Sequence, residues 1–289
     1  MKKKKLLLII ILILSLIMVI DVCAKMWVNY NINKPQIPVL MYHSIIYDEL
    51  YNNEPEVITL SAFEEQMKYL NDNGYKTLTL DQLYDWKKGK NKSYEKAVVL
   101  TFDDGFYNVY YLARPILEKY DFHAAEFIIG SSVNKVTKPF NQNEYGTIGL
   151  DVISTTDSVI EYQSHSYDLH QLIDGKKKIL ISSNLELEND LSKMKELMEP
   201  TYMTYPYNTD TSQMRSLLKK YNYKLAFRCE SEKATKEVDN YQVPRIGVSN
   251  DFEDFKTIFE TTSYNNRYGN GLLRKILVTI ERKFKMKLF

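Results

Sequence analysis

"AVVLTFDDGFYN", residues 97–108, carries the clearest strand signal in the chain and its most unusual pair of side chains. Residues 97–102 are apolar or β-branched, which is typical of a buried strand in a parallel sheet. Two adjacent carboxylates, Asp103 and Asp104, end this run, and Gly105 follows at once. Neighbouring carboxylates at the end of a buried strand repel each other and lose hydration. They form either a polar turn or a site whose chemistry needs both acids.

Strand and helix patterns alternate along the rest of the chain, which predicts a βα architecture. Further strands are predicted at residues 37–43, 124–130, 158–164, 201–206, 224–228 and 241–248, and helices at 61–74, 108–120, 184–199 and 211–221. Ser61 and Glu64 are expected to form a capping box for the first helix, and Pro115 is expected to kink the second. About seven such units predict an α/β fold, a distorted (β/α)7-type barrel that is irregular or incompletely closed.

The N-terminus has the pattern of an export signal. MKKKK precedes an apolar run over residues 6–20, and a basic start before a short apolar segment is typical of a signal peptide. We interpret residues 1–24 as a signal peptide or an N-terminal membrane anchor, and residues 25–36 as a tether. We therefore expect the protein to be exported and either secreted or held at the cell surface.

Residues 37–264 are predicted to form a single domain, expected to be monomeric, because no repeat or long linker interrupts them. Residues 265–289 are rich in basic side chains and have leucine, isoleucine and phenylalanine at helical spacing, which predicts a basic amphipathic helix. This helix either packs on the barrel with its basic face in water or lies on a membrane or an anionic polymer. The packed arrangement is the favoured interpretation.

The composition narrows the possible ligands. Lys and Arg number 38 against 37 Asp and Glu, so no overall positive charge argues for nucleic-acid binding. Once Cys23 is set aside with the leader, Cys229 is the only cysteine. A processed chain can therefore form neither an intramolecular disulfide nor a multi-cysteine zinc site, and any metal would be held by histidine and carboxylate side chains.

Polar residues follow several of the predicted strands. In a βα barrel the residues just past the carboxyl ends of the strands meet at one rim, where active sites are assembled. These positions hold His43, Asp103, Asp104, His165, Pro206, Tyr207 and Arg245, and His170 lies in the same loop as His165.

Two imidazoles and one carboxylate are a common ligand set for Zn²⁺ and also suit Co²⁺, Ni²⁺ or Fe²⁺. One of the two aspartates would bind the metal, and the other would remain beside it as a base. Asp168 or Ser166 would hold an imidazole N–H.

Each feature alone also has a purely structural explanation. Two histidines five residues apart are more often on the surface than on a metal, and His43 on an apolar strand would usually be a hydrogen-bonded core residue. The sequence YPYN, residues 205–208, would usually be a turn. Their coincidence at the carboxyl ends of strands in one predicted barrel favours a common site.

TFDDG, residues 101–105, together with the downstream SHSYDLH, residues 164–170, resembles the NodB-type polysaccharide deacetylases of carbohydrate esterase family four. The similarity extends over residues 37–250. The resemblance implies that the first aspartate, Asp103, is the general base. It also implies that the second, Asp104, binds a divalent metal with His165 and His170.

Two departures from the usual family pattern resemble the branch that N-deacetylates poly-β-1,6-N-acetyl-D-glucosamine. Three residues separate Ser166 from His170, where the family usually has two, and no Leu-x-His motif lies near the C-terminus. In that branch the acid histidine comes from the first strand, so the resemblance assigns this role to His43 of LMYHSI.

YPYN matches a further family motif, in which a backbone N–H stabilises an oxyanion; we assign this N–H to Tyr207. Asn208 stands where the family usually has glycine, so the loop is expected to differ from the usual family conformation. Arg245 of VPRIGV is expected to keep Asp103 ionised.

The resemblance implies metal-dependent removal of acetyl groups from N-acetylglucosamine residues of an extracellular polysaccharide. A deacetylase of peptidoglycan or of another cell-wall polymer is an alternative with the same chemistry. A non-catalytic carbohydrate-binding module is an alternative from another class, but such a module has no need of both Asp103 and His43.

Overall fold

In this computed structural model the described residues are 35–90, 94–155 and 157–260, with isolated positions at 15, 16, 18, 19, 22, 23 and 26. Residues Gln36–Glu260 form a compact unit. The predicted helix at 265–289 lies outside the described residues, as do most of the predicted leader and tether. None of the helices in the described ranges combines the length and the apolar character that a membrane crossing requires.

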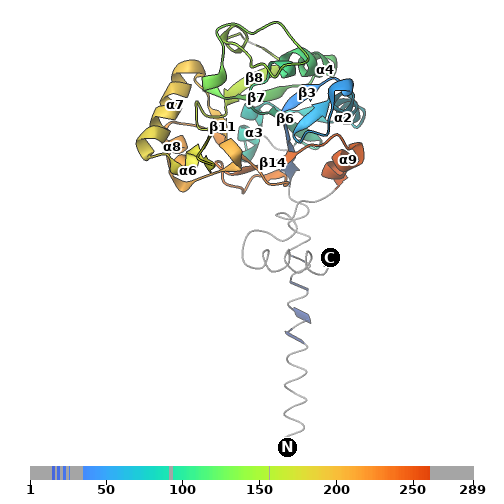
Figure 1. Ribbon diagram of the computed structural model, residues 1–289. Coiled ribbons are helices and arrows are strands. Elements are labelled where there is room, and N and C mark those ends of the chain that lie inside the picture. The colour runs from blue at the N-terminus through green and yellow to red at the C-terminus, as the bar shows by residue number, and fades with distance from the viewer. Residues whose placement is uncertain are drawn as a thin grey trace, which may run out of the picture. The chain divides into compact units, whose positions relative to one another are not determined.

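Strands and helices alternate along this unit (Figure 1). The strands are β1 (Gln36–Ile37), β2 (Val39–Tyr42), β3 (Ser44–Ile46), β4 (Val57–Thr59), β5 (Lys76–Thr77), β6 (Ala97–Phe102), β7 (Ala124–Ile128), β8 (Ile160–Ser164), β9 (Leu172–Ile173), β10 (Lys176–Lys177), β11 (Tyr202–Thr204), β12 (Leu225–Cys229), β13 (Ala234–Thr235) and β14 (Val243–Gly247). The helices are η1 (Asp48–Leu50), α2 (Leu60–Asp72), α3 (Leu80–Lys87), η2 (Val109–Ala113), α4 (Arg114–Lys119), η3 (Gly130–Ser132), α5 (Leu150–Ile153), α6 (Lys178–Ile181), α7 (Asn184–Met198), η4 (Pro206–Asn208), α8 (Ser212–Lys220) and α9 (Phe252–Glu260).

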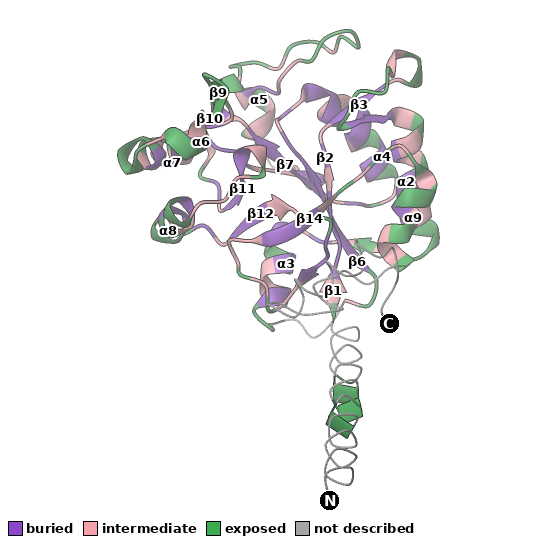
Figure 2. Ribbon diagram, turned by 60° about the horizontal axis from the view of Figure 1, so that its bottom comes forward, coloured by how far each residue is buried: buried purple, intermediate pink, exposed green. Residues whose placement is uncertain are grey.

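Seven parallel strands form a closed barrel in the order β2-β14-β12-β11-β8-β7-β6, and the pairing of β2 with β6 closes the ring. The short strand β5 extends the sheet by pairing with the first two residues of β6. Helices surround the barrel, and Figure 2 shows buried strands at the centre with the outward helix faces exposed. The predicted (β/α)7-type barrel is confirmed.

Alternation along β6 separates two apolar layers. Val98, Leu100 and Phe102 pack with residues of α2 and α4 outside the barrel. Ala97 and Val99 belong to the interior cluster, to which α3 and β1 also contribute. Because β1 directly precedes β2, this apolar cluster fills the end of the barrel at which the strands begin. The polar rim lies at the opposite end.

The junction between β8 and β11 is the thinnest part of the barrel, with one pair of register partners, Met203 and Ser164. The side chain of Gln163 compensates, because its Oε1 accepts hydrogen bonds from the backbone N–H groups of Thr201 and Tyr202, both at 3.1 Å. A side chain thus replaces part of the backbone ladder here, which makes the barrel irregular as expected.

The helices α3 and α9 were not predicted, and two further local differences concern the starts of predicted helices. Thr59, not Ser61, caps α2, with its Oγ1 accepting from Ala62 N–H at 3.2 Å, so the predicted capping box is wrong. The Ser61 hydroxyl instead bonds to Asp48. The irregularity expected at Pro115 takes the form of the π-helical turn η2 immediately before α4.

Candidate active site

Side chains alternate along β6, so Asp103, two residues after the inward-facing Thr101, also points inward. Its carboxylate therefore lies inside the barrel at the polar rim. There it is 3% exposed and receives two hydrogen bonds from Arg245 of β14. Arg245 Nη1 lies 2.8 Å from Asp103 Oδ1 and Nη2 lies 2.6 Å from Oδ2. Nη1 also donates to Thr101 Oγ1 at 3.1 Å, so two residues at the carboxyl end of β6 fix the guanidinium.

Two opposing effects set the ionisation of Asp103. Burial alone would raise its pKa, but the charge and the hydrogen bonds of Arg245 lower the pKa by more. The result is a pKa well below the usual range of an aspartate, so this carboxyl group is an anion throughout the working range of most enzymes.

His43 directly follows β2 and lies across from this anion. Its Nε2 is 4.0 Å from Asp103 Oδ2 and 3.9 Å from Oε2 of Glu56. Glu56 comes from the segment between η1 and β4 and was not identified from the sequence, because nothing in its local pattern relates it to His43. The imidazole thus faces one buried and one exposed carboxylate.

A tight turn separates Asp104 from Asp103. Asp104 and Gly105 both have left-handed backbone conformations, with φ of 75° and 77°. A Cβ at position 105 would also lie 3.0 Å from Cδ1 of Ile128, so glycine is required there. Aspartate tolerates a positive φ better than most residues. The turn directs Asp104 toward the loop that follows β8.

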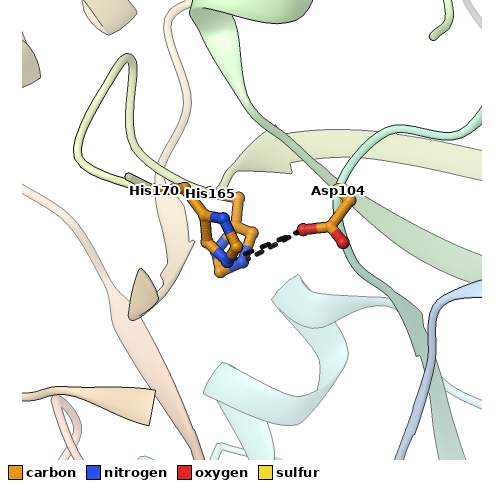
Figure 3. A group of neighbouring side chains, drawn as sticks. All are labelled: Asp104, His165 and His170. Carbon is orange, nitrogen blue, oxygen red and sulfur yellow. Dashed lines mark ion pairs between the residues drawn. The ribbon is translucent and has the colours of Figure 1, made fainter. Parts of the chain in front are cut away.

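That loop carries His165 and His170, whose imidazoles face Asp104 (Figure 3). Asp104 Oδ1 lies 3.6 Å from His165 Nε2 and 3.9 Å from His170 Nε2. The three ligand atoms lie within 4.8 Å of one another. Within the described ranges, Asp104 Oδ1 is buried and accepts no hydrogen bond.

The donor set fits a divalent cation. An orphaned carboxylate oxygen and two imidazole nitrogens are the ligand types of a metal site with open positions. His165 is oriented for this role, because its Nδ1 lies 3.1 Å from the backbone oxygen of Thr204 and therefore leaves Nε2 free as an acceptor. Burial also lowers the pKa of His165, and the charges of Asp103 and Asp104 offset only part of this effect.

The predicted imidazole partners, Asp168 and Ser166, are corrected by this geometry: Thr204 of β11 holds the His165 N–H. The carboxylate of Asp168 instead accepts from Lys178, at 2.7 Å, and from Gln171. Nothing in the sequence relates Thr204 to His165, because Thr204 ends β11 and His165 follows β8, and these two strands meet only in the barrel.

Helix α7 holds the loop that carries His165 and His170, which has one residue more than the usual family motif. Asp190 Oδ1 accepts from Tyr167 N–H at 2.9 Å, and Oδ2 accepts from Asp168 N–H at 2.6 Å. Burial raises the pKa of Asp190 to about 6, although these two N–H groups lower it. A carboxylate in α7 therefore fixes Tyr167 and Asp168, two of the three residues between Ser166 and His170.

Tyr207 lies at the same rim, and its ring stacks on His170 with 4.2 Å between centroids. Tyr207 and Asn208 both have positive φ, 52° and 53°. Asparagine tolerates this conformation better than most residues. Its side chain also accepts from Cys229 N–H and donates to Cys229 O, both at 2.7 Å. The loop therefore forms without the usual glycine.

These side chains line one pocket of about 410 Å³ that also includes Glu56 and Lys177. Lys177 was not predicted either. Its Nζ donates to the backbone oxygen of Tyr207 at 2.9 Å and to Thr209 Oγ1 at 3.0 Å. All the predicted catalytic, metal-ligand and oxyanion residues and Arg245 line this pocket, at the barrel end opposite the apolar cluster, whereas Ser166, Asp168 and Pro206 do not. The fold and the rim chemistry define a barrel enzyme of the hydrolase class.

Comparison with known proteins agrees with the assignment to a barrel hydrolase. The family model described as "Polysaccharide deacetylase" matches residues 90–226. A poly-beta-1,6-N-acetyl-D-glucosamine N-deacetylase of Staphylococcus epidermidis is 31% identical over 201 residues, which cover 67% of this chain and 68% of the relative.

Two solved structures share the fold. The Streptococcus pyogenes deacetylase PplD in complex with acetate matches with a TM-score of 0.66 and 20% identity, over 80% of this chain and all of that one. IcaB of Ammonifex degensii matches with a TM-score of 0.64 and 22% identity, over 78% and 95% of the two chains.

The chain belongs to the polysaccharide deacetylase family. It is an amide hydrolase of the polysaccharide N-deacetylase type, which confirms the resemblance seen in the sequence.

Proposed function

We propose that this protein removes acetyl groups from N-acetylglucosamine residues of a β-1,6-linked extracellular polysaccharide, producing free amines and acetate, and that the reaction depends on a divalent metal. One observation carries the proposal: a single pocket holds an ionised carboxylate, a histidine and a three-residue ligand cluster. The name of the staphylococcal relative supports the choice of polymer.

Asp104, His165 and His170 would hold the metal, for which zinc is the first candidate and Co²⁺, Ni²⁺ or Fe²⁺ are alternatives. A bound divalent cation supplies Lewis acidity, which polarises an acetamide carbonyl and lowers the pKa of a water molecule.

The residues of the chain perform the proton transfers. Asp103 is ionised before the reaction and accepts a proton from the attacking water, as a general base. Because its pKa is held low, it is a weak acceptor and needs an acidified water. His43 donates a proton to the departing sugar nitrogen, and the carboxylates of Asp103 and Glu56 lie 4.0 and 3.9 Å from its Nε2.

The backbone N–H of Tyr207 is assigned to the oxyanion that develops on the acetamide oxygen. Its ring covers one face of His170, and Lys177 fixes its backbone oxygen. These contacts hold the peptide unit in place before substrate binds.

Export and location belong to the same proposal. The basic and apolar N-terminal segment supports export, with the protein secreted or held at the membrane by residues 1–24. The basic segment 265–289 is a second candidate for a membrane contact. The partner is the polysaccharide itself, the protein acts as a monomer, and nucleic acid is not a ligand.

The test is amine release from β-1,6-linked N-acetylglucosamine oligomers and from chitin oligomers. It is carried out with added zinc or cobalt, with chelator, and with the Asp103→Asn variant. We expect metal-dependent release from the 1,6-linked substrate that is lost in the variant. Release from the 1,4-linked substrate alone would redirect the assignment to cell wall or chitin. Binding of oligomers without turnover of either substrate would favour a binding module.

A further inference from the structure

A second pocket of about 250 Å³ lies between two segments that are far apart in sequence, the stretch after β3 and the loop around residues 140–145. Ligand pockets for drug-sized molecules measure ~300–1,000 Å³, so this one suits a group the size of one sugar ring. No step of the proposed mechanism uses it.

This pocket is next to the catalytic one. Glu54 lines the second pocket and Glu56 lines the first, so the same segment forms part of both walls. Phe106, two residues after the metal-ligand candidate Asp104, packs against Tyr145 of the second pocket with 5.7 Å between ring centroids. A polymer that places one residue at the metal ligands therefore passes close to this pocket.

Aromatic rings form part of its lining. Tyr145 remains 54% exposed, and its hydroxyl donates to Glu54 Oε2 at 2.9 Å. Tyr47 and Phe140 also line the pocket, with 6.3 Å between their ring centroids. Rings of this kind offer a large apolar surface at a fixed position, which suits the apolar C–H face of a sugar ring.

The polar lining matches sugar hydroxyl and acetamido groups. Asn52, Gln142 and Asn143 line the pocket, and within the described ranges their side-chain amides make no hydrogen bond. An amide offers both donors and an acceptor, as a hydroxyl group requires. The lining holds two carboxylates, Glu54 and Glu144, and no lysine or arginine. It therefore suits a neutral or ammonium-bearing hexosamine and disfavours an anionic sugar.

We propose that this pocket is a binding subsite for a further hexosamine residue of the same polymer, beyond the immediate neighbour of the residue that is deacetylated at the catalytic pocket, so that a disaccharide does not reach it. This inference rests on the proposed function and adds a chain-length preference. The enzyme acts better on longer oligomers because the subsite contributes to binding, whereas the catalytic groups remain unchanged.

The test compares Tyr145→Ala with the wild-type full chain on a β-1,6-linked N-acetylglucosamine disaccharide and a hexasaccharide. Loss of one aromatic contact is expected to raise KM for the hexasaccharide about five- to tenfold. We expect kcat to stay within about twofold and the disaccharide kinetics to stay unchanged, because only binding of the longer chain is weakened. Tyr145→Phe should retain most of the affinity, and Gln142→Ala, at an exposed position, is a second variant expected to change KM in the same direction.

Tyr84→Ala on α3, far from the rim, is the matched control and should leave both substrates unaffected. Equal KM values for wild type and Tyr145→Ala on the hexasaccharide would overturn the subsite while leaving the deacetylase function intact. An equal loss of kcat on both substrates would also overturn it, because Tyr145 would then only support Phe106. If the wild type deacetylates neither oligomer, calorimetric binding of the hexasaccharide to Asp103→Asn, with and without Tyr145→Ala, decides the subsite independently of catalysis.

Discussion

At the scale of single residues, the pairing of Asp103 with Arg245 decides the chemistry. Two short hydrogen bonds in a buried site keep the carboxylate ionised and fix its direction. The same pairing weakens Asp103 as a proton acceptor, since the pKa of an effective base lies near the working pH. Such a weak base can act only on a water molecule whose pKa is lowered. A divalent cation held by the adjacent ligand cluster would lower that pKa.

Arg245→Met should lower the free energy of unfolding by ~3–5 kcal/mol at neutral pH, because it leaves a buried carboxylate without its partner. The folded-state pKa of Asp103 is depressed, so its paired form stabilises the fold above about pH 4, the unfolded value. This contribution is lost as the pH falls below that value. The deficit of the variant should therefore be largest near pH 7 and should shrink in acid.

Denaturant unfolding at several pH values measures this effect. Arg228→Met is the matched control, since Arg228 sits on the neighbouring strand β12 and pairs with Asp210 at a partly exposed position. Arg228→Met should lower the free energy of unfolding by about 1 kcal/mol or less. An equal loss in both variants would mean that the ion pair with Asp103 has no special role.

At the scale of elements, the loop between β8 and β9 depends on α7. The carboxylate of Asp190 accepts both consecutive N–H groups in the middle of the histidine loop. Because the carboxylate of Asp190 bonds to the backbone between His165 and His170, it acts through the backbone that carries them. Helix α7 is therefore part of the candidate metal site although it supplies no ligand.

Asp190→Asn should weaken zinc binding about tenfold, the lower end of the range for residues that support metal ligands. The amide nitrogen cannot accept a hydrogen bond, so one of the two loop N–H groups loses its partner. Calorimetric titration with zinc gives the affinity directly, without an activity assay. Glu188→Gln on the same helix, where Glu188 pairs with Lys220, is the control, and equal affinities in both variants would exclude the positioning role.

At the scale of the whole molecule, closure of the barrel brings the site together. Asp104 follows β6, the histidines follow β8, Thr204 ends β11 and Arg245 belongs to β14. The ring is thinnest between β8 and β11, where Gln163 replaces part of the backbone ladder. This junction also lies directly below the contact between His165 and Thr204.

Gln163→Leu should therefore destabilise the fold by ~1–3 kcal/mol, because two backbone N–H groups lose their acceptor. Thermal unfolding followed by circular dichroism measures the change. Gln213→Leu, an exposed position on α8, makes the same substitution without removing such a contact and should be close to neutral. Equal melting temperatures for the two variants would show that the ladder closes without Gln163.

The sequence by itself determined the seven strands of the barrel, the order of their βα units and the family. These features depend on local periodicity and on short motifs, such as the two aspartates before Gly105 and the two histidines of one loop. The pocket contains all the predicted catalytic, metal-ligand and oxyanion residues. Strand ends predict this clustering, because the strands of a parallel barrel all point to one rim.

Only the tertiary structure decided which side chains support that rim. Thr204, and not Asp168 or Ser166, orients His165; Asp190 fixes the histidine loop; and Glu56 and Lys177 join the pocket. Asn208 replaces glycine because it bonds to Cys229, 21 residues away. Each contact joins segments that become neighbours only when the ring closes. The physical reason is that the geometry of hydrogen bonds between distant elements depends on strand register, which local patterns do not encode.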